Sequence, residues 1–143
     1  LLACLAFCNR LFYLNMEKPH HGTQTVLTVL GKFEHSVIEQ FYKLTKIDWK
    51  TQNEFENDHS LDRRISLSVN DSIEIARKNF PTFFDQILEN SESMKYRLRH
   101  LNQIKSQEMR KLLKKGMPCS TVLSLVMPFV TEKWLESKVL GIG

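Results

Sequence analysis

Glycine and proline are scarce in this sequence, which has five glycines and four prolines among 143 residues. An all-β fold needs frequent tight turns, and these two residues usually supply them. No stretch alternates apolar and polar residues for long enough to indicate a strand. The scarcity therefore argues against a sandwich or barrel and favours an all-α chain.

The motifs of catalysis and cofactor binding are also missing. The sequence has no Gly-rich phosphate loop, no HExxH and no CxxC pair. Its five histidines are scattered, and no His, Asp or Glu lies at ligand spacing from Cys4 and Cys8. Whether these two cysteines or Cys119 form disulfides stays open. We predict a non-enzymatic protein with no catalytic residues, no metal and no cofactor.

No apolar run is long enough to cross a bilayer, which takes about 20 residues. The opening run, LLACLAFCNRLFYL, is interrupted by Asn9 and Arg10. It could be the stub of a cleaved signal peptide, a helix packed on the body or on a partner, or a surface that meets lipid. We hypothesise that this run and the C-terminal PFVTEKWLESKVLGIG contact a membrane, through Leu1, Leu5, Phe12, Phe129, Trp134, Leu135 and Leu140.

Apolar residues recur at steps of three and four through most of the chain, which is the period of an amphipathic helix. They predict long helices near 25–44, 60–89 and 92–115, and short helices after Ser120. The first of these has the apolar stripe Leu27, Leu30, Phe33, Val37, Phe41 and Leu44.

Helix breakers refine these boundaries. Pro81 should kink or split the second helix, the ENSES segment should separate it from the third, and Gly116 is a natural C-cap. The sequence predicts one domain over 1–143, a bundle of about five helices over 23–143 preceded by an apolar segment over 1–22.

Charge is distributed unevenly along the chain. Between Lys95 and Lys115 there are eight basic residues and one acid, whereas 54–92 holds nine acids and four bases. An ordinary amphipathic helix has a solvated charged face of this kind. A basic face also attracts anionic lipid headgroups, and we predict that role for Lys95, Arg97, Arg99, Lys105, Arg110, Lys111, Lys114 and Lys115.

A resemblance to a known family adds to this interpretation. The segments FEHSVIEQFYKLTKIDW, LDRRISLSVN and NFPTFFDQI follow one another much as they do in the abalone sperm lysin family. The matching residues are Trp49, the cluster Asp62-Arg63-Arg64, and Val69-Asn70. The similarity spans roughly 33–130 and contains no signature motif.

Some features depart from lysin itself. Lysin is strongly basic over two tracks, but this chain is acidic through its middle helix. Ile73 and Ile75 replace aromatic residues, and the ends are apolar. The apolar ends look more like those of the fusagenic acrosomal branch of the family.

The resemblance implies a five-helix, non-enzymatic protein that is secreted from the sperm acrosomal vesicle and acts in sperm–egg membrane fusion. Its partners would be a lipid bilayer, an egg-surface receptor, or a second copy bound through the apolar surface.

Three alternatives stay open. One is lysin-like, non-enzymatic dissolution of the egg vitelline envelope. Another is a helical signalling or interaction protein, for which the apolar ends would be a receptor or dimer surface. The third is nucleic-acid binding by 95–115, which the flanking acids and the lack of interleaved surface aromatics disfavour.

Overall fold

The computed structural model describes residues 25–128, and these residues form an all-α bundle without strands. The predicted fold class is therefore confirmed for this part of the chain. The elements, in order, are α2 (Val26–Asp48), α3 (Gln52–Glu56), α4 (Leu61–Asn79), the 3-10 turn η1 (Pro81–Phe83), α5 (Phe84–Leu113) and α6 (Cys119–Val126).

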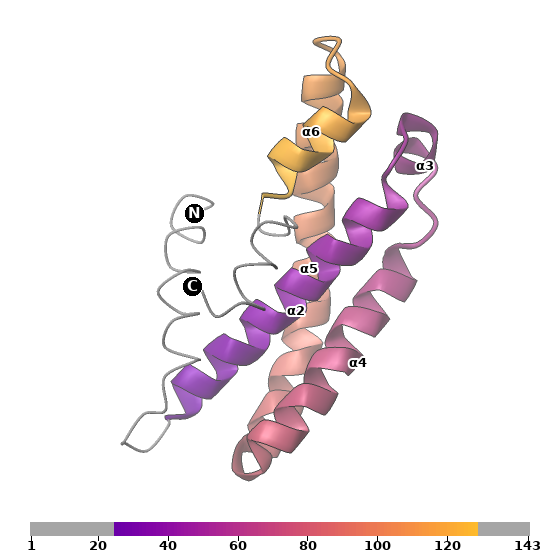
Figure 1. Cartoon of the computed structure of the whole chain (residues 1–143). Coiled ribbons are helices and arrows are strands. Elements are labelled where there is room, and N and C mark those ends of the chain that lie inside the picture. Colours follow the sequence, from indigo (N-terminus) through magenta and orange to yellow (C-terminus); the bar gives the residue numbers. More distant parts are fainter. Residues whose placement is uncertain (1–24, 129–143) are drawn as a thin grey trace.

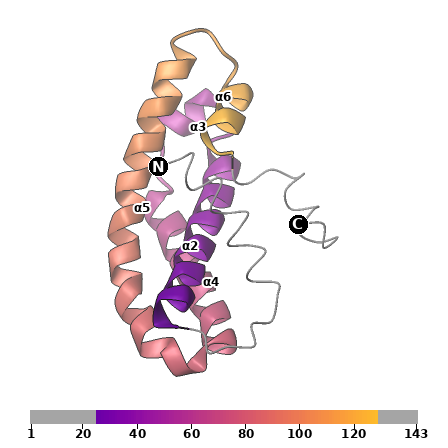
Figure 2. The ribbon, with the colours of Figure 1, turned by 90° about the vertical axis from the view of Figure 1, so that its left-hand side faces the viewer.

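Three long helices, α2, α4 and α5, lie side by side and make up the body of the bundle (Figure 1). The two short helices, α3 and α6, lie together at the end where α5 finishes (Figure 2). That end therefore collects the C-terminal turns of α2 and α5 together with both short helices.

Local sequence sets most of the helix ends. Thr25 and Thr51 precede α2 and α3, and each side-chain oxygen accepts a hydrogen bond from the backbone N–H three residues on, at 3.2 Å. Gly116, the predicted C-cap, lies just beyond α5 with a φ of +86°, a left-handed conformation that favours glycine. The predicted split at Pro81 is also confirmed, because α4 ends at Asn79 and Pro81 opens the 3-10 turn.

The predicted break at ENSES is wrong. Helix α5 runs without interruption through Glu89–Ser93 and is 30 residues long. Ser91 lies on the buried side, where its hydroxyl donates a 2.6 Å hydrogen bond to the Leu88 carbonyl, and the Asn90 amide reaches Glu34 of α2. These polar side chains are satisfied within a helix, so they do not end it.

The polar connection after the first helix is also shorter than predicted. Helix α2 continues to Asp48, and α3 occupies part of the remaining segment. Phe55 is the buried residue of α3, so this helix is held on the bundle by one large side chain.

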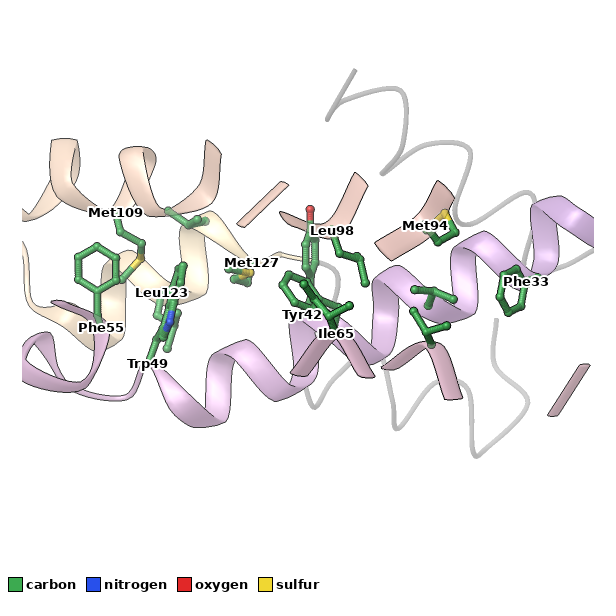
Figure 3. Close-up of a cluster of buried hydrophobic side chains, with 14 of the residues drawn as sticks. Phe33, Tyr42, Trp49, Phe55, Ile65, Met94, Leu98, Met109, Leu123 and Met127 are labelled. Atoms are coloured by element: carbon green, nitrogen blue, oxygen red, sulfur yellow. The ribbon is translucent and has the colours of Figure 1, made fainter. Parts of the chain in front are cut away.

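The core follows the predicted stripes with some exceptions. It runs the length of the bundle, from Phe33 and Met94 to Trp49, Phe55 and Met109 (Figure 3). Leu27 was expected in the stripe but is 78% exposed, and Leu88 and Ile104 also lie on the surface. In α2 the neighbouring Val29 is buried instead, because the packed face is turned slightly from the one that the leucines predicted.

None of the helices between residues 25 and 128 is both long and apolar enough to cross a membrane.

Candidate functional site

Helix α5 carries six of the eight basic residues that the sequence assigned to a lipid-facing surface, and Lys114 and Lys115 follow its last turn. The helix packs between α2 and α4 through an apolar stripe that includes Ile87, Met94, Leu98 and Met109. The structure divides the eight residues into three groups with different surroundings.

Three of the basic residues are paired with acids. Arg97 lies 2.7 Å from Glu34 of α2, and Arg99 lies 2.7 Å from Asp62 of α4. Lys95 pairs with Glu92 one turn earlier in α5, at 3.2 Å. Arg97 and Arg99 thus flank the packed face of α5 and connect it to the helix on each side.

Lys105 does not lie on the surface, so its assignment to a lipid-facing position is wrong. Its side chain is 1% exposed, with Nζ 3.6 Å from Glu108 and 5.5 Å from the centre of the Tyr42 ring. Burial lowers the pKa of the Lys105 ammonium, although the Glu108 charge opposes this shift. Burial, together with the Glu108 charge, raises the pKa of Tyr42.

The spacing of Lys105 contained a signal for this burial. It follows Leu98 and Leu101 and precedes Met109 at the steps of three and four that mark the packed face of a helix. The long aliphatic stem of lysine can occupy such a position. Lys105 was assigned to the surface by its charge, although its position in the helix repeat predicts the packed face.

The other four basic residues, Arg110, Lys111, Lys114 and Lys115, are exposed at the C-terminal end of α5. We call them the basic end. Within residues 25–128 none of the four forms an ion pair. The Arg110 guanidinium lies 5.4 Å from the centre of the Phe55 ring of α3.

Local electrostatics allow four cations to gather there. The last turn of a helix carries partial negative charge on its free carbonyls, which favours basic side chains. Arg110 and Lys114, and likewise Lys111 and Lys115, are four residues apart, so each pair repels by a few tenths of a kcal/mol. An external anion bound between them would relieve that repulsion.

A buried arginine, Arg64, connects several helices of the bundle. The Arg64 side chain is 0% exposed. Its Nη2 donates to Asp58 Oδ2 at 2.6 Å, its Nη1 donates to Thr45 Oγ1 at 2.6 Å and to Asn102 Oδ1 at 3.1 Å, and its Nε donates to Ser60 Oγ at 2.8 Å. One side chain of α4 therefore joins α2, α5 and the connection before α4.

The charges in this cluster compensate one another. Burial lowers the pKa of Arg64, while Asp58 and Asp48 raise it. Burial pushes the pKa of Asp58 upward. The Arg64 charge, with hydrogen bonds from Arg64, Ser60 and Asn102, outweighs that effect, so the carboxyl pKa lies below its usual value. An ion pair of this kind belongs to the structure of the bundle, because the Arg64 guanidinium is fully buried and its hydrogen bonds join α4 to α2 and α5.

Trp49 connects the Arg64 cluster to the basic end. The Arg64 guanidinium lies 5.4 Å from the Trp49 ring, and Phe55 meets that ring edge to face at 5.0 Å between centroids. The Cys119 thiol of α6 lies 3.7 Å from the Trp49 carbonyl oxygen, to which it donates. The indole Nε1–H has no acceptor among residues 25–128, and the ring itself contacts Phe55 and Arg64. Sequence reasoning named Trp49 and Arg64 separately but did not predict that they stack.

The remaining site predictions concern membrane contact and metal binding. The seven residues predicted to contact a membrane, Leu1, Leu5, Phe12, Phe129, Trp134, Leu135 and Leu140, lie outside the described residues. Between residues 25 and 128 no group of three His, Cys, Asp or Glu side chains is placed to hold a metal ion. His59 and His100 are both exposed.

Comparison with known proteins identifies no relative. No protein-family model, no curated protein and no solved structure matches this chain. What the basic end can bind is therefore inferred from its own residues.

Proposed function

We propose that this protein binds anionic membrane surfaces through the basic end of α5 and acts there without catalysis. The observation that carries the proposal is the separation of the eight basic residues between Lys95 and Lys115 into paired, buried and free groups. Of these eight residues, only Arg110, Lys111, Lys114 and Lys115 are both exposed and without an acid partner among residues 25–128. Within this group they are the residues whose charge is available to an external ligand.

The expected strength follows from the number of charges. Each basic residue close to an anionic membrane contributes about 1 kcal/mol, so four contribute about 4 kcal/mol. That corresponds to a millimolar dissociation constant, which is reversible attachment. Stable binding would need a second contribution, and the hypothesised contacts of Phe129, Trp134 and Leu135 with lipid would supply it.

The resemblance to the abalone sperm lysin family supplies the biological setting of the proposal. In that setting the protein is secreted from the sperm acrosomal vesicle, and it perturbs the egg or sperm membrane so that the two fuse. An egg-surface receptor would select the membrane, and the basic end would hold the protein against its headgroups.

Binding to vesicles tests the proposal. The wild type should co-sediment with vesicles that contain phosphatidylserine at low ionic strength, and binding should weaken at about 0.15 M salt, where the screening length falls to about 8 Å. Lys111→Glu with Lys114→Glu should weaken binding by about 30-fold or more, since at least 2 kcal/mol of attraction is lost.

A matched control separates the site from net charge. Lys43→Glu with Lys78→Glu changes the charge by the same amount at exposed positions, and Lys78, like Lys111, lies in the last turn of its helix. This control should bind within about threefold of wild type. Equal loss in both double variants, or no binding of the wild type at low salt, would refute the proposal.

Membrane fusion has a separate test, because it needs the apolar segments. Leu5→Glu or Phe12→Glu should abolish lipid mixing between vesicles while leaving attachment through the basic end in place. Lipid mixing by these variants at the wild-type rate would remove fusion from the proposal and leave attachment.

A further inference from the structure

The chain contains one asparagine in the pattern Asn-x-Ser/Thr, and it lies in α4 as Asn70-Asp71-Ser72. This pattern is the acceptor for N-linked glycans in proteins that enter the secretory route. Neither the basic end nor the Arg64 cluster uses these residues, so the motif needs its own account.

The structure places the two essential side chains on opposite sides of α4. Residues two apart in a helix differ by about 200° in direction. Asn70 is exposed, whereas Ser72 is 1% exposed and its hydroxyl shares a 2.9 Å hydrogen bond with the hydroxyl of Ser36 on α2. The acceptor amide therefore faces solvent, and the hydroxyl that makes it an acceptor faces the core.

The surroundings of Asn70 leave room for a large substituent. Its neighbours along the outer face of α4 are Ser66, Leu67, Asp71 and Glu74, all of them exposed. The Asn70 side chain makes no hydrogen bond within residues 25–128. Leu67, one turn away, is 39% exposed, and a sugar attached at Asn70 would shield it.

We propose that Asn70 carries an N-linked glycan, attached before α4 folds. The proposal rests on the secretory route in the proposed function. The co-reactant is a lipid-linked oligosaccharide diphosphate. A bond forms between Asn70 Nδ2 and the anomeric carbon of the first sugar while the bond from that carbon to the phosphate oxygen breaks. The lipid diphosphate leaves, and the amide loses one proton.

The burial of Ser72 determines when the glycan can be attached to Asn70. A transferase that reads the Ser72 hydroxyl can reach it only while the chain is extended, because the folded bundle encloses that hydroxyl against Ser36. Folding then turns the modified Asn70 outward, where no core contact has to move.

The glycan would leave the basic end free. Arg64 contacts Asn102, and these two residues mark the same level of the bundle. Asn70 is six residues from Arg64 in one direction, and Lys111 is nine residues from Asn102 in the other, so they lie about 20 Å apart along the axis. A membrane can thus approach the basic end while the outer face of α4 stays covered.

The test is translation of the full chain, behind a cleavable leader, in the presence of microsomes. Protease protection selects the translocated chains. Wild type should gain the mass of one glycan, and peptide N-glycosidase should remove it. Asn70→Gln and Ser72→Ala should lose the added mass, whereas Ser72→Thr should keep it.

A second acceptor provides the matched control. In the Asn70→Gln background, Ser66→Asn creates the same pattern one turn earlier, again with an exposed acceptor and a buried hydroxyl, that of Ser68. This variant should regain the glycan.

Translocated wild type of unmodified mass overturns the proposal, and so does added mass that persists in Asn70→Gln. Vesicle binding is measured separately on the purified protein, so failure of either proposal is recognised independently of the other.

Discussion

Replacing Arg64 by methionine tests whether the buried arginine holds the bundle together. Methionine fills a similar volume, so the change removes the guanidinium without opening a large cavity. Four hydrogen bonds from Arg64 disappear, to Asp58, Thr45, Asn102 and Ser60. The change leaves the acceptors in place, and all four belong to buried or half-buried residues.

The expected cost is about 3–4 kcal/mol of unfolding free energy. Breaking a buried ion pair by removing one partner costs about 3–5 kcal/mol, because the remaining charge is left uncompensated. The lower half of that range applies here, since the Asp58 side chain is 15% exposed and water can reach part of it. Replacing Asp58 by asparagine in the same chain should recover part of the loss, because the carboxylate that lost its partner is then removed.

The adjacent residue, Arg63, provides the matched control. It pairs with Asp48 at 2.5 Å, but its side chain is 55% exposed. Exposed ion pairs contribute about 0–1 kcal/mol, so Arg63→Met should cost less than about 1 kcal/mol. Urea unfolding followed by circular dichroism measures both variants. With a slope of about 2 kcal/mol per molar urea, Arg64→Met should lower the midpoint by about 1.5–2 M. Equal losses at Arg64 and Arg63 would refute the reasoning.

The same cluster predicts how stability depends on pH. The pKa of Asp58 in the folded protein lies below its unfolded value of about 3.9. The folded state therefore binds fewer protons between these two values, and the contribution is fully present above pH 4. It should be lost as the pH falls through the folded pKa. In Arg64→Met this part of the acid dependence should shrink, which titration of stability between pH 2 and 5 would detect.

Further substitutions test the corrections to the sequence interpretation, each by urea unfolding. Lys105→Met should cost less than about 1 kcal/mol or stabilise the bundle, because a buried cation is replaced by an apolar chain of similar volume and Glu108 can turn to solvent; a loss above 3 kcal/mol would contradict this. Leu27→Glu should change stability by at most about 0.5 kcal/mol, as at other surface sites, whereas Phe33→Ala should cost about 3–5 kcal/mol. Ser93→Pro should cost about 3 kcal/mol if α5 is continuous through the ENSES segment, and no cost would restore the predicted break.

Sequence alone determined the fold class and most helix positions, because the causes are local. Ile65, Val69 and Ala76 lie four and seven residues apart, spacings that return to one face of a helix, and all three are buried in α4. Pro81 removes a backbone donor wherever it lies, so the end of α4 was predictable. Gly116 adopts a left-handed conformation just beyond α5, and glycine tolerates it because it has no Cβ.

The break predicted at ENSES was wrong because it was based on local sequence alone. Asparagine and serine weaken a helix on average because they offer the backbone other hydrogen-bond partners. In α5 the Asn90 amide instead reaches Glu34, which lies 56 residues earlier in the chain. The helix continues because packing against α2 gives its polar residues partners that no local pattern contains.

The tertiary structure decided which charges are available to an external ligand. The eight basic residues between Lys95 and Lys115 look alike in sequence, yet Arg97 and Arg99 meet Glu34 and Asp62, which are distant in the chain. Lys105 turns inward to the ring of Tyr42. A charge is free only when folding brings no opposite charge within a few ångströms, and that depends on how three helices pack. Composition could therefore predict a basic helix, but only the packing of α2 and α4 against α5 confines its unpaired charge to Arg110–Lys115.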